Sequence, residues 1–268
     1  MSTKTGRWKT IRTVFFLPVA ELRRLLVDPA RLDRLADGDR QLPLLPDETH
    51  YLRRVLRLRS GDPVAVVDGV GGLWTASLLG ADHLEIPAEQ DLNHRQAPPR
   101  PALGLAVVLM RRGTEEWLRM GCELGLDRFQ PLTSERRVAQ ADHRPQRWAV
   151  ILREAVEQCE RLWSPELSDL KSLDDWCPDP DARVAFAVTR DASAPHAEEW
   201  LERAADHSRP IWIVIGPEGG WTDRERQLAD QRGWQPVSFG ASILRSSTAA
   251  VHAAVTLASW RSRLVSHS

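Results

Sequence analysis

Residues 216–220, Gly-Pro-Glu-Gly-Gly, place three glycines and a carboxylate directly after the apolar run 211–215. That run predicts a buried strand, and the spacing of Thr222 and Glu225 predicts a helix opened by a capping box. A glycine turn between a strand's carboxyl end and a helix N-terminus lets backbone N–H groups approach a ligand. The spacing differs from dinucleotide and triphosphate motifs. Glycines needed only for the geometry of the turn would give the same pattern.

A second glycine turn follows the strand predicted over 236–239. It spans residues 240–246 and ends where Ser246 or Ser247 can cap the last helix. Ligands bind at the carboxyl ends of parallel strands, so we expect the two turns to lie side by side. Arg245 stands just before the caps, where the helix dipole disfavours a cation, and we therefore take it as a functional candidate rather than a surface arginine.

The elements around these turns indicate an α/β domain with a mostly parallel sheet. Continuous apolar runs predict strands buried on both faces, and they alternate with segments of helical periodicity. The strands are expected at 103–109, 183–188 and 211–215, and the helices at 115–124, 148–162 and 248–260. Such alternation is typical of a parallel sheet covered by helices.

The first 95 residues have a different rhythm. Short apolar stretches at 14–17, 63–69 and 73–79 are separated by turn-forming residues, which predicts a small β-barrel or sandwich. Three prolines within 96–101 cannot continue a helix or a central strand. We therefore expect two domains, one over 12–96 and one over 101–263.

The composition is that of a globular protein and excludes several classes. Lys and Arg number 36 against 37 Asp and Glu, so the net charge by itself does not indicate a nucleic-acid partner. The three cysteines lie far apart and the histidines form no metal-binding motif. No apolar run approaches 18 residues and no signal peptide is evident, so we expect a cytoplasmic protein with no metal and no membrane partner.

Several segments resemble one enzyme family. VIGPEGGWTDRE (214–225) and FGASILRSSTA (239–249) are similar to the two hallmark motifs of the bacterial enzymes that methylate N3 of one uridine in 16S ribosomal RNA, the RsmE family of the knotted SPOUT superfamily. Residues 123–138 and 147–167 resemble the family's helical segments. HYLRRVLRLRSGDPVAVVDG (50–69) resembles its PUA-like RNA-binding barrel, so the likeness covers nearly the whole chain.

The resemblance implies a C-terminal trefoil-knotted SPOUT methyltransferase domain, an N-terminal PUA-like β-barrel and a homodimer. It implies S-adenosylmethionine as the cofactor and small-subunit ribosomal RNA, or the 30S subunit, as the partner. By motif match, the residues of both turns and one residue past the 183–188 strand would bind the cofactor. They are Thr189, Gly216, Pro217, Glu218, Gly219, Gly220, Phe239, Gly240, Ile243, Leu244, Arg245, Ser246 and Thr248.

Methylation of uracil N3 requires an aligned donor and acceptor, and a group that stabilises the negative charge developing as N3–H is lost. Arg245 is the first candidate for this catalytic role. Arg161 matches a family arginine and is the second; we expect it to share a helix face with Glu154 and Gln158, although an ordinary solvated face has the same composition. Glu218 could act as the proton acceptor, or it could serve only to shape the loop at 216–220.

The PUA-like segment carries a basic cluster. Arg53, Arg54 and Arg57 lie within residues 51–60, which contain four arginines and no acidic residue. Such a cluster suits contacts to RNA phosphates, although a solvated basic face looks the same.

Four positions depart from the family: Ser246 replaces a threonine, Met120 a lysine and Glu160 a glycine, and Ser247 replaces a carboxylate that is usual there. Two other hypotheses remain open. The first keeps the superfamily but takes a ribose 2′-hydroxyl as the methyl acceptor. The second is a non-catalytic RNA-binding or ribosome-assembly protein, in which the change at Ser247 marks a lost activity.

Overall fold

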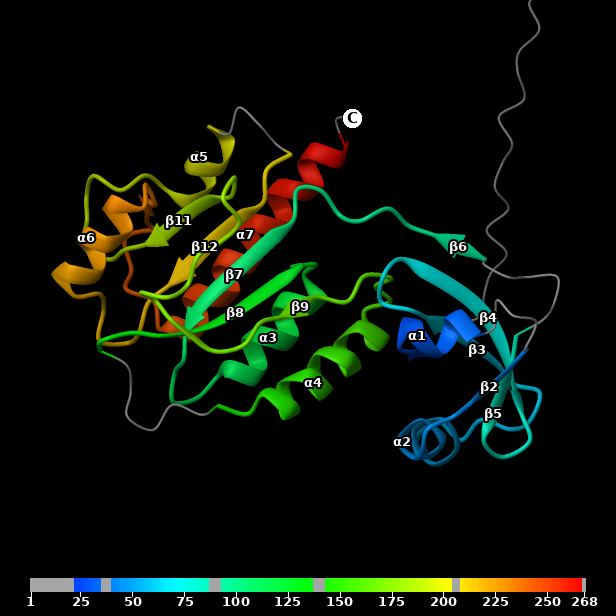
Figure 1. Cartoon of the computed structure of the whole chain (residues 1–268). Helices are drawn as coiled ribbons and strands as arrows, with labels where there is room; N and C mark the ends of the chain where they lie inside the picture. Colours follow the sequence, from blue (N-terminus) through cyan, green and yellow to red (C-terminus); the bar gives the residue numbers. More distant parts are fainter. Residues whose placement is uncertain (1–21, 35–39, 87–92, 137–142, 204–207, 267–268) are drawn as a thin grey trace, which may run out of the picture.

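The computed structural model describes residues 22–34, 40–86, 93–136, 143–203 and 208–266. They form two sheets, and Figure 1 shows the smaller one beside the larger helix-covered one. The strand predicted at 14–17 lies outside the described residues. Among the described residues, no helix is long and apolar enough to cross a membrane.

The N-terminal sheet has the strand order β1-β3-β4-β5-β2, with β6 paired to β4. These strands are β1 (Arg24–Leu26), β2 (Gln41–Pro43), β3 (Pro63–Val67), β4 (Gly72–Leu79), β5 (His83–Glu85) and β6 (His94–Arg95). Three short helical segments, α1 (Pro29–Leu32), α2 (Pro46–His50) and the π-helical turn η2 (Tyr51–Val55), flank it. Residues of β1 to β5 and η2 share a single apolar core, so the sheet curls around one interior: Leu25, Leu42, Leu52, Val64, Leu78 and Leu84 belong to it.

The C-terminal sheet is parallel throughout, with the order β10-β8-β7-β12-β11-β13 and β9 paired to β8. Its strands are β7 (Leu103–Val108), β8 (Arg128–Thr133), β9 (Glu166–Leu167), β10 (Lys171–Ser172), β11 (Arg183–Ala187), β12 (Ile211–Ile215) and β13 (Gln235–Val237). Every residue of β7 and β12 is buried, as their continuous apolar runs predict for central strands covered on both faces.

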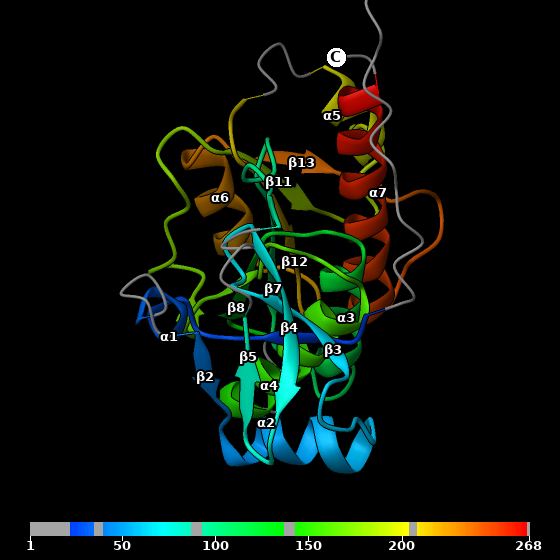
Figure 2. The same cartoon turned by 90° about the vertical axis from the view of Figure 1, so that its right-hand side faces the viewer.

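Helices cover both faces of this sheet. Leu105 and Ile213 point into a core formed with α3 (Thr114–Glu123), α4 (Pro145–Gln158), α5 (Ala197–Glu202) and α7 (Ser246–Ser266). The alternate residues Ala106 and Val214 point into a second core, formed with α6 (Asp223–Gln231) and four tryptophans. Figure 2 shows α6 and α7 on opposite sides of the sheet. The predicted fold class, an α/β domain with a parallel sheet behind an N-terminal β-domain, is confirmed, while the knot remains a prediction.

The helix predicted at 148–162 is displaced. It begins at Pro145, which suits a first helical turn, and it ends at Gln158. Glu160 has a φ of 62°, a left-handed conformation in which a helix stops. The prediction that Glu154, Gln158 and Arg161 share one helix face is therefore wrong, because Arg161 lies beyond the helix.

The two domains meet where β1 packs on α4. Glu157 is buried at this contact, with 8% of its surface exposed. Its Oε1 accepts a hydrogen bond from the backbone N–H of Leu26 at 2.9 Å. Backbone N–H groups of Gly71 and Ser164 add two cross-domain bonds of 2.8 Å, to Leu162 O and Gly69 O. The proline-rich segment separates β6 from β7, and we propose it as the boundary between domains.

Burial raises the pKa of Glu157 above its ordinary value of 4.5, against the opposing effects of the Leu26 N–H and the Arg153 guanidinium. The folded state then holds this proton more tightly than the unfolded state. Protonated Glu157 therefore contributes to the stability of the folded state. This contribution is fully present below pH 4.5, the ordinary pKa that applies in the unfolded chain, and is lost as the pH rises through the raised pKa of the folded state. We expect the free energy of unfolding of the wild type to fall over this window relative to Glu157→Gln. Urea unfolding at several pH values measures it, with the exposed Glu198→Gln as control; parallel pH profiles for wild type and Glu157→Gln would contradict the prediction.

Candidate active site

The two glycine turns lie side by side at the carboxyl edge of the parallel sheet. The first begins at Gly216, where β12 ends, and the second leads from β13 into α7. Ser246, the first residue of α7, donates a hydrogen bond from its hydroxyl to the carbonyl oxygen of Gly216 at 2.9 Å. This bond joins two segments thirty residues apart in the chain. The proximity predicted from the strand ends is thus observed.

Gly216 is required by its surroundings rather than by its backbone angles. A Cβ at this position would stand 2.7 Å from the indole of Trp221, which is closer than side chains approach. That indole is itself held, because its Nε1 donates to Ala187 O at 2.8 Å and its ring stacks on Phe186 with 4.3 Å between centroids. The packing of Trp221 therefore explains the glycine and fixes the course of the first turn.

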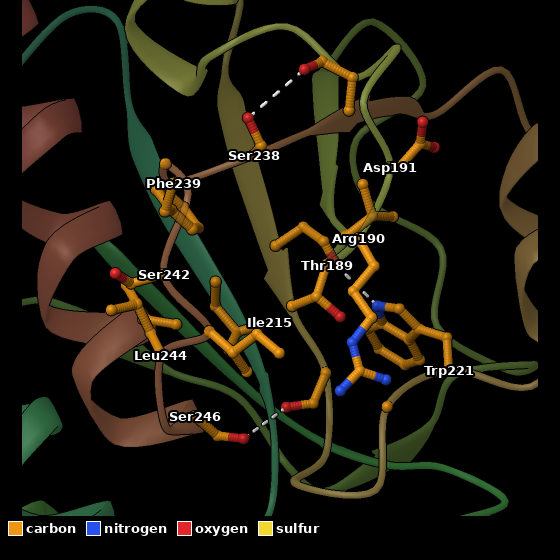
Figure 3. Close-up of a pocket in the computed structure, with 18 of the residues that line it drawn as sticks. Thr189, Arg190, Asp191, Ile215, Trp221, Ser238, Phe239, Ser242, Leu244 and Ser246 are labelled. Carbon is orange, nitrogen blue, oxygen red and sulfur yellow. Dashed lines mark hydrogen bonds between the residues drawn. The ribbon is translucent and has the colours of Figure 1, made fainter.

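A cavity of about 620 Å³ lies between the two turns and the end of β11. This volume is within the range of small-molecule sites. Figure 3 shows its walls, which combine apolar side chains such as Ile215, Phe239 and Leu244 with polar ones such as Thr189 and Ser246. The predicted residues that line it are Thr189, Gly216, Pro217, Gly220, Phe239, Gly240, Ile243, Leu244 and Ser246.

A third segment, which follows β11, completes the cavity. Thr189 is the only residue of this segment that the sequence predicted to bind the cofactor. Arg190 and Asp191 also line the cavity, as does Arg226 of α6. Arg190 has a φ of 59°, an uncommon backbone conformation for a residue with a side chain. The only sequence signal for these residues was their position directly past a predicted strand, at the same edge as the glycine turns.

Asp191 is held as a carboxylate. It accepts hydrogen bonds from the backbone N–H of Ser193 at 3.0 Å and from the Ser193 hydroxyl at 2.6 Å. These bonds lower the pKa of Asp191 below its ordinary value, helped by the charge of Arg226. The cavity thus offers one fixed anion and two cations to a bound molecule.

A second cavity, of about 950 Å³, continues from the first toward solvent and adds Arg136, Glu218, Gly219 and Arg245 to its walls. The Arg136 guanidinium donates to Gly219 O at 3.2 Å, which ties the first glycine turn to the end of β8. The predicted residues Glu218, Gly219 and Arg245 therefore lie at the mouth of the site rather than in its inner part. Thr248, also predicted, is exposed on α7 and lines neither cavity.

Arg161, the second catalytic candidate, is not brought to these cavities. Its guanidinium donates to Cys122 O at 2.9 Å and pairs with Asp127 Oδ1 at 3.1 Å, just past the C-terminal end of α3. Backbone carbonyls at a helix end lack partners within the helix, and Arg161 satisfies one of them. Asp127 precedes β8, at the amino edge of the sheet, away from both glycine turns. These contacts give Arg161 a role in holding α3, and its catalytic role stays a prediction that they do not support.

The basic cluster of the N-terminal domain is only partly available for contacts. Arg53 donates to Leu58 O at 3.2 Å and to Ala81 O at 3.4 Å, so it holds neighbouring loops together. Arg54 and Arg57 are exposed. Contact of these arginines with RNA stays a prediction, and Arg54 and Arg57 are the better placed for it.

Two family models match the chain. The RNA methyltransferase domain matches residues 98–258, and the RNA methyltransferase PUA domain matches residues 44–86. The glycine turns and the cavity thus fall within the first region, and the basic cluster falls within the second. Among the described residues, no group of three His, Cys, Asp or Glu side chains is placed to hold a metal ion.

Named relatives agree. Ribosomal RNA small subunit methyltransferase E of Synechocystis sp. is 36% identical over 233 residues, which cover 84% of this chain and 74% of that protein. The crystal structure of the Neisseria gonorrhoeae ribosomal RNA small subunit methyltransferase E, bound to S-adenosyl methionine, has a TM-score of 0.69 at 26% identity and covers 88% of this chain and 96% of its own. A Legionella pneumophila methyltransferase structure with bound cofactor, 23% identical with a TM-score of 0.71, shares the fold over 91% of this chain and 98% of its own.

Fold, site and matches therefore define an RNA methyltransferase with an N-terminal PUA domain. Within that class, the chain belongs to the ribosomal RNA small subunit methyltransferase E family.

Replacing Ser246 with Ala removes the bond between the two turns. Loss of one buried hydrogen bond costs about 1 kcal/mol, so we expect roughly fivefold weaker binding of S-adenosylmethionine, the cofactor expected from the sequence. Isothermal titration calorimetry measures the effect, and Ser262→Ala, an exposed change on the same helix, is the matched control. Equal cofactor affinity of Ser246→Ala and the control would show that this bond does not shape the site.

Proposed function

We propose that this protein uses S-adenosylmethionine to methylate N3 of a specific uridine in small-subunit (16S) ribosomal RNA. The observation that carries the proposal is the cavity between the turns at 216–220 and 240–246, in a chain that belongs to the methyltransferase E family. The partner would be the RNA itself or the 30S subunit.

The residues present fit the cofactor. S-adenosylmethionine combines an adenosine, a sulfonium and an amino-acid end that bears an ammonium and a carboxylate. Ile215, Phe239 and Leu244 supply apolar walls for a purine, and backbone groups of the glycine turns supply donors and acceptors at its edge. Arg190 and Asp191 supply charges of the signs that complement the amino-acid end. When bound, the cofactor supplies an electrophilic methyl group.

The protein's own contribution is alignment and electrostatics. In-line displacement requires the acceptor nitrogen to face the methyl group, and holding the two in register lowers the barrier by pre-organising them. The Ser246–Gly216 bond and the packed Trp221 hold the turns that would set this register. Apolar residues around the inner cavity exclude water from the reacting groups.

Arg245 is the residue we assign to stabilise the uracil anion. It lines the mouth of the cavity together with Glu218, between solvent and the inner site. A guanidinium there faces an entering base and can stabilise the charge that spreads onto its carbonyl oxygens as N3 loses its proton. Glu218, on the same wall, supplies a carboxylate that can accept this proton.

The proposal includes a homodimer acting in the cytoplasm. Val255 of α7 is an exposed apolar residue, as is Ile243 at the cavity, and a second subunit would cover such side chains. Light scattering of the purified protein tests the dimer directly.

Nucleoside mapping tests the activity. Small-subunit RNA from a strain lacking the protein should lack one N3-methyluridine, and the purified protein with S-adenosylmethionine should restore it, as read by mass spectrometry of a nuclease digest. A new 2′-O-methylated ribose would instead assign the other acceptor. Restoration of neither product, with normal cofactor binding, would favour a non-catalytic role in ribosome assembly.

Arg245→Ala should lower the methylation rate far more than it weakens cofactor binding, because the interaction is made with the developing charge. A loss of about a hundredfold or more in turnover is expected. Arg245→Lys keeps the charge but not the planar fork, and it should restore part of the rate. Single-turnover kinetics and calorimetry separate the two effects; equal and small losses in both would remove Arg245 from this role.

A further inference from the structure

A third cavity, of about 540 Å³, adjoins the mouth of the active site. It is lined by Arg111, Arg112, Gly113, Glu116, Glu218, Arg245 and Ser247. Arg245 and Glu218 also line the neighbouring cavity, so the two spaces share a wall. Arg111, Arg112 and Glu116 have no part in the site described above.

Two helices begin at this cavity. Arg111 and Arg112 lie between the end of β7 and α3, whose N-cap is Gly113 with a φ of 98° and no side-chain cap. A Cβ on Gly113 would stand 3.1 Å from Cβ of Ser247, so the first turns of α3 and α7 are in close contact. Helix N-termini carry partial positive charge and backbone N–H groups without helical partners. Both favour an anion in the space between them.

The arginines of this cavity differ from those that form ion pairs elsewhere in the fold. Arg224, Arg128 and Arg153, for example, are each paired with carboxylates. Within the described part of the chain, none of Arg111, Arg112 and Arg245 forms an ion pair, and all three are exposed. The lining carries these three arginines and two carboxylates, Glu116 and Glu218, so three positive minus two negative charges give a net charge of +1. The unpaired guanidinium groups and the helix N-termini together favour an anion in this space.

We infer that this cavity is a phosphate subsite, which binds the RNA backbone next to the target uridine while the base enters the adjoining cavity. The inference rests on the proposed function for the identity of the RNA. The inference depends on the wall that the two cavities share, which Arg245 and Glu218 form. A phosphate bound by Arg111 and Arg112 would leave the attached nucleoside beside these two residues. Arginine forks suit phosphate oxygens, and one such contact orients a nucleotide without reading its base.

Two variants test the subsite in full-length protein. Arg111→Ala/Arg112→Ala removes the cations. Arg111→Glu/Arg112→Glu reverses their charge at two exposed positions outside the helices and strands, so the fold should be retained. Arg119→Ala, which removes one exposed arginine of α3 that pairs with Glu123, is the control for charge alone.

The readout is binding of a small-subunit RNA fragment at several salt concentrations, with calorimetry of S-adenosylmethionine alongside. We expect RNA affinity to fall about tenfold or more in both test variants. The slope of log affinity against log salt should become shallower by about one for the double alanine variant, since one phosphate contact is lost. Cofactor affinity should stay within about twofold of the wild type, and the control should change neither quantity by more than that.

Unchanged RNA affinity and salt slope in both test variants would overturn the subsite. A parallel loss of cofactor affinity would also overturn it, because the arginines would then serve the cofactor. Failure of the proposed function reads differently. In that case the wild type still binds RNA more tightly than the Arg111→Ala/Arg112→Ala variant does. The wild-type protein nevertheless restores no N3-methyluridine in the mapping experiment.

Discussion

The active site depends on the contact between two turns that leave the same edge of a parallel sheet. Ser246 binds Gly216 O at 2.9 Å, and Gly216 can approach only because it lacks a Cβ beside Trp221. Parallel strands all end at one edge, so successive turns are brought together without any direct sequence relation between them. The cavity and its apolar walls follow from this approach, and the segment after β11 and α6 add its charges.

The tryptophan at the first turn connects the site to the core. Trp221 stacks on Phe186 and donates to Ala187 O, both at the end of β11, and it belongs to the same apolar core as Trp176 and Trp234. The third wall of the cavity, at Arg190 and Asp191, leaves the sheet directly after these contacts. Packing on the α6 face therefore sets the position of polar groups that face the cavity. Such support from buried neighbours is what a site needs to keep its geometry.

Positive charge follows a continuous course across the chain's functional surfaces. Arg190 and Arg226 lie in the inner cavity, Arg245 at its mouth, and Arg111 and Arg112 beyond it. The overall composition, with 36 basic and 37 acidic residues, conceals this distribution. Arginines elsewhere in the fold, such as Arg128, Arg153 and Arg224, are paired with carboxylates, whereas the arginines of the third cavity form no ion pair within the described residues. A polyanion would find its binding groups where the fold gathers unpaired arginines.

The sequence by itself determined the two kinds of domain, the buried strands and the two glycine turns, because strand periodicity, proline and glycine act locally. It also pointed to nine of the residues that line the inner cavity. Only the tertiary structure decided the roles of the arginines. Arg161 followed a matching motif, yet a left-handed residue at Glu160 ends the helix before it and directs it to the carbonyls of α3. No sequence pattern distinguished Arg111 and Arg112 from other arginines. Their cavity forms only where the N-termini of α3 and α7 meet, and these helices are more than a hundred residues apart in the chain. The residue type determines whether a side chain can carry a charge. Whether that charge is paired, buried or free depends on which distant segments pack around it.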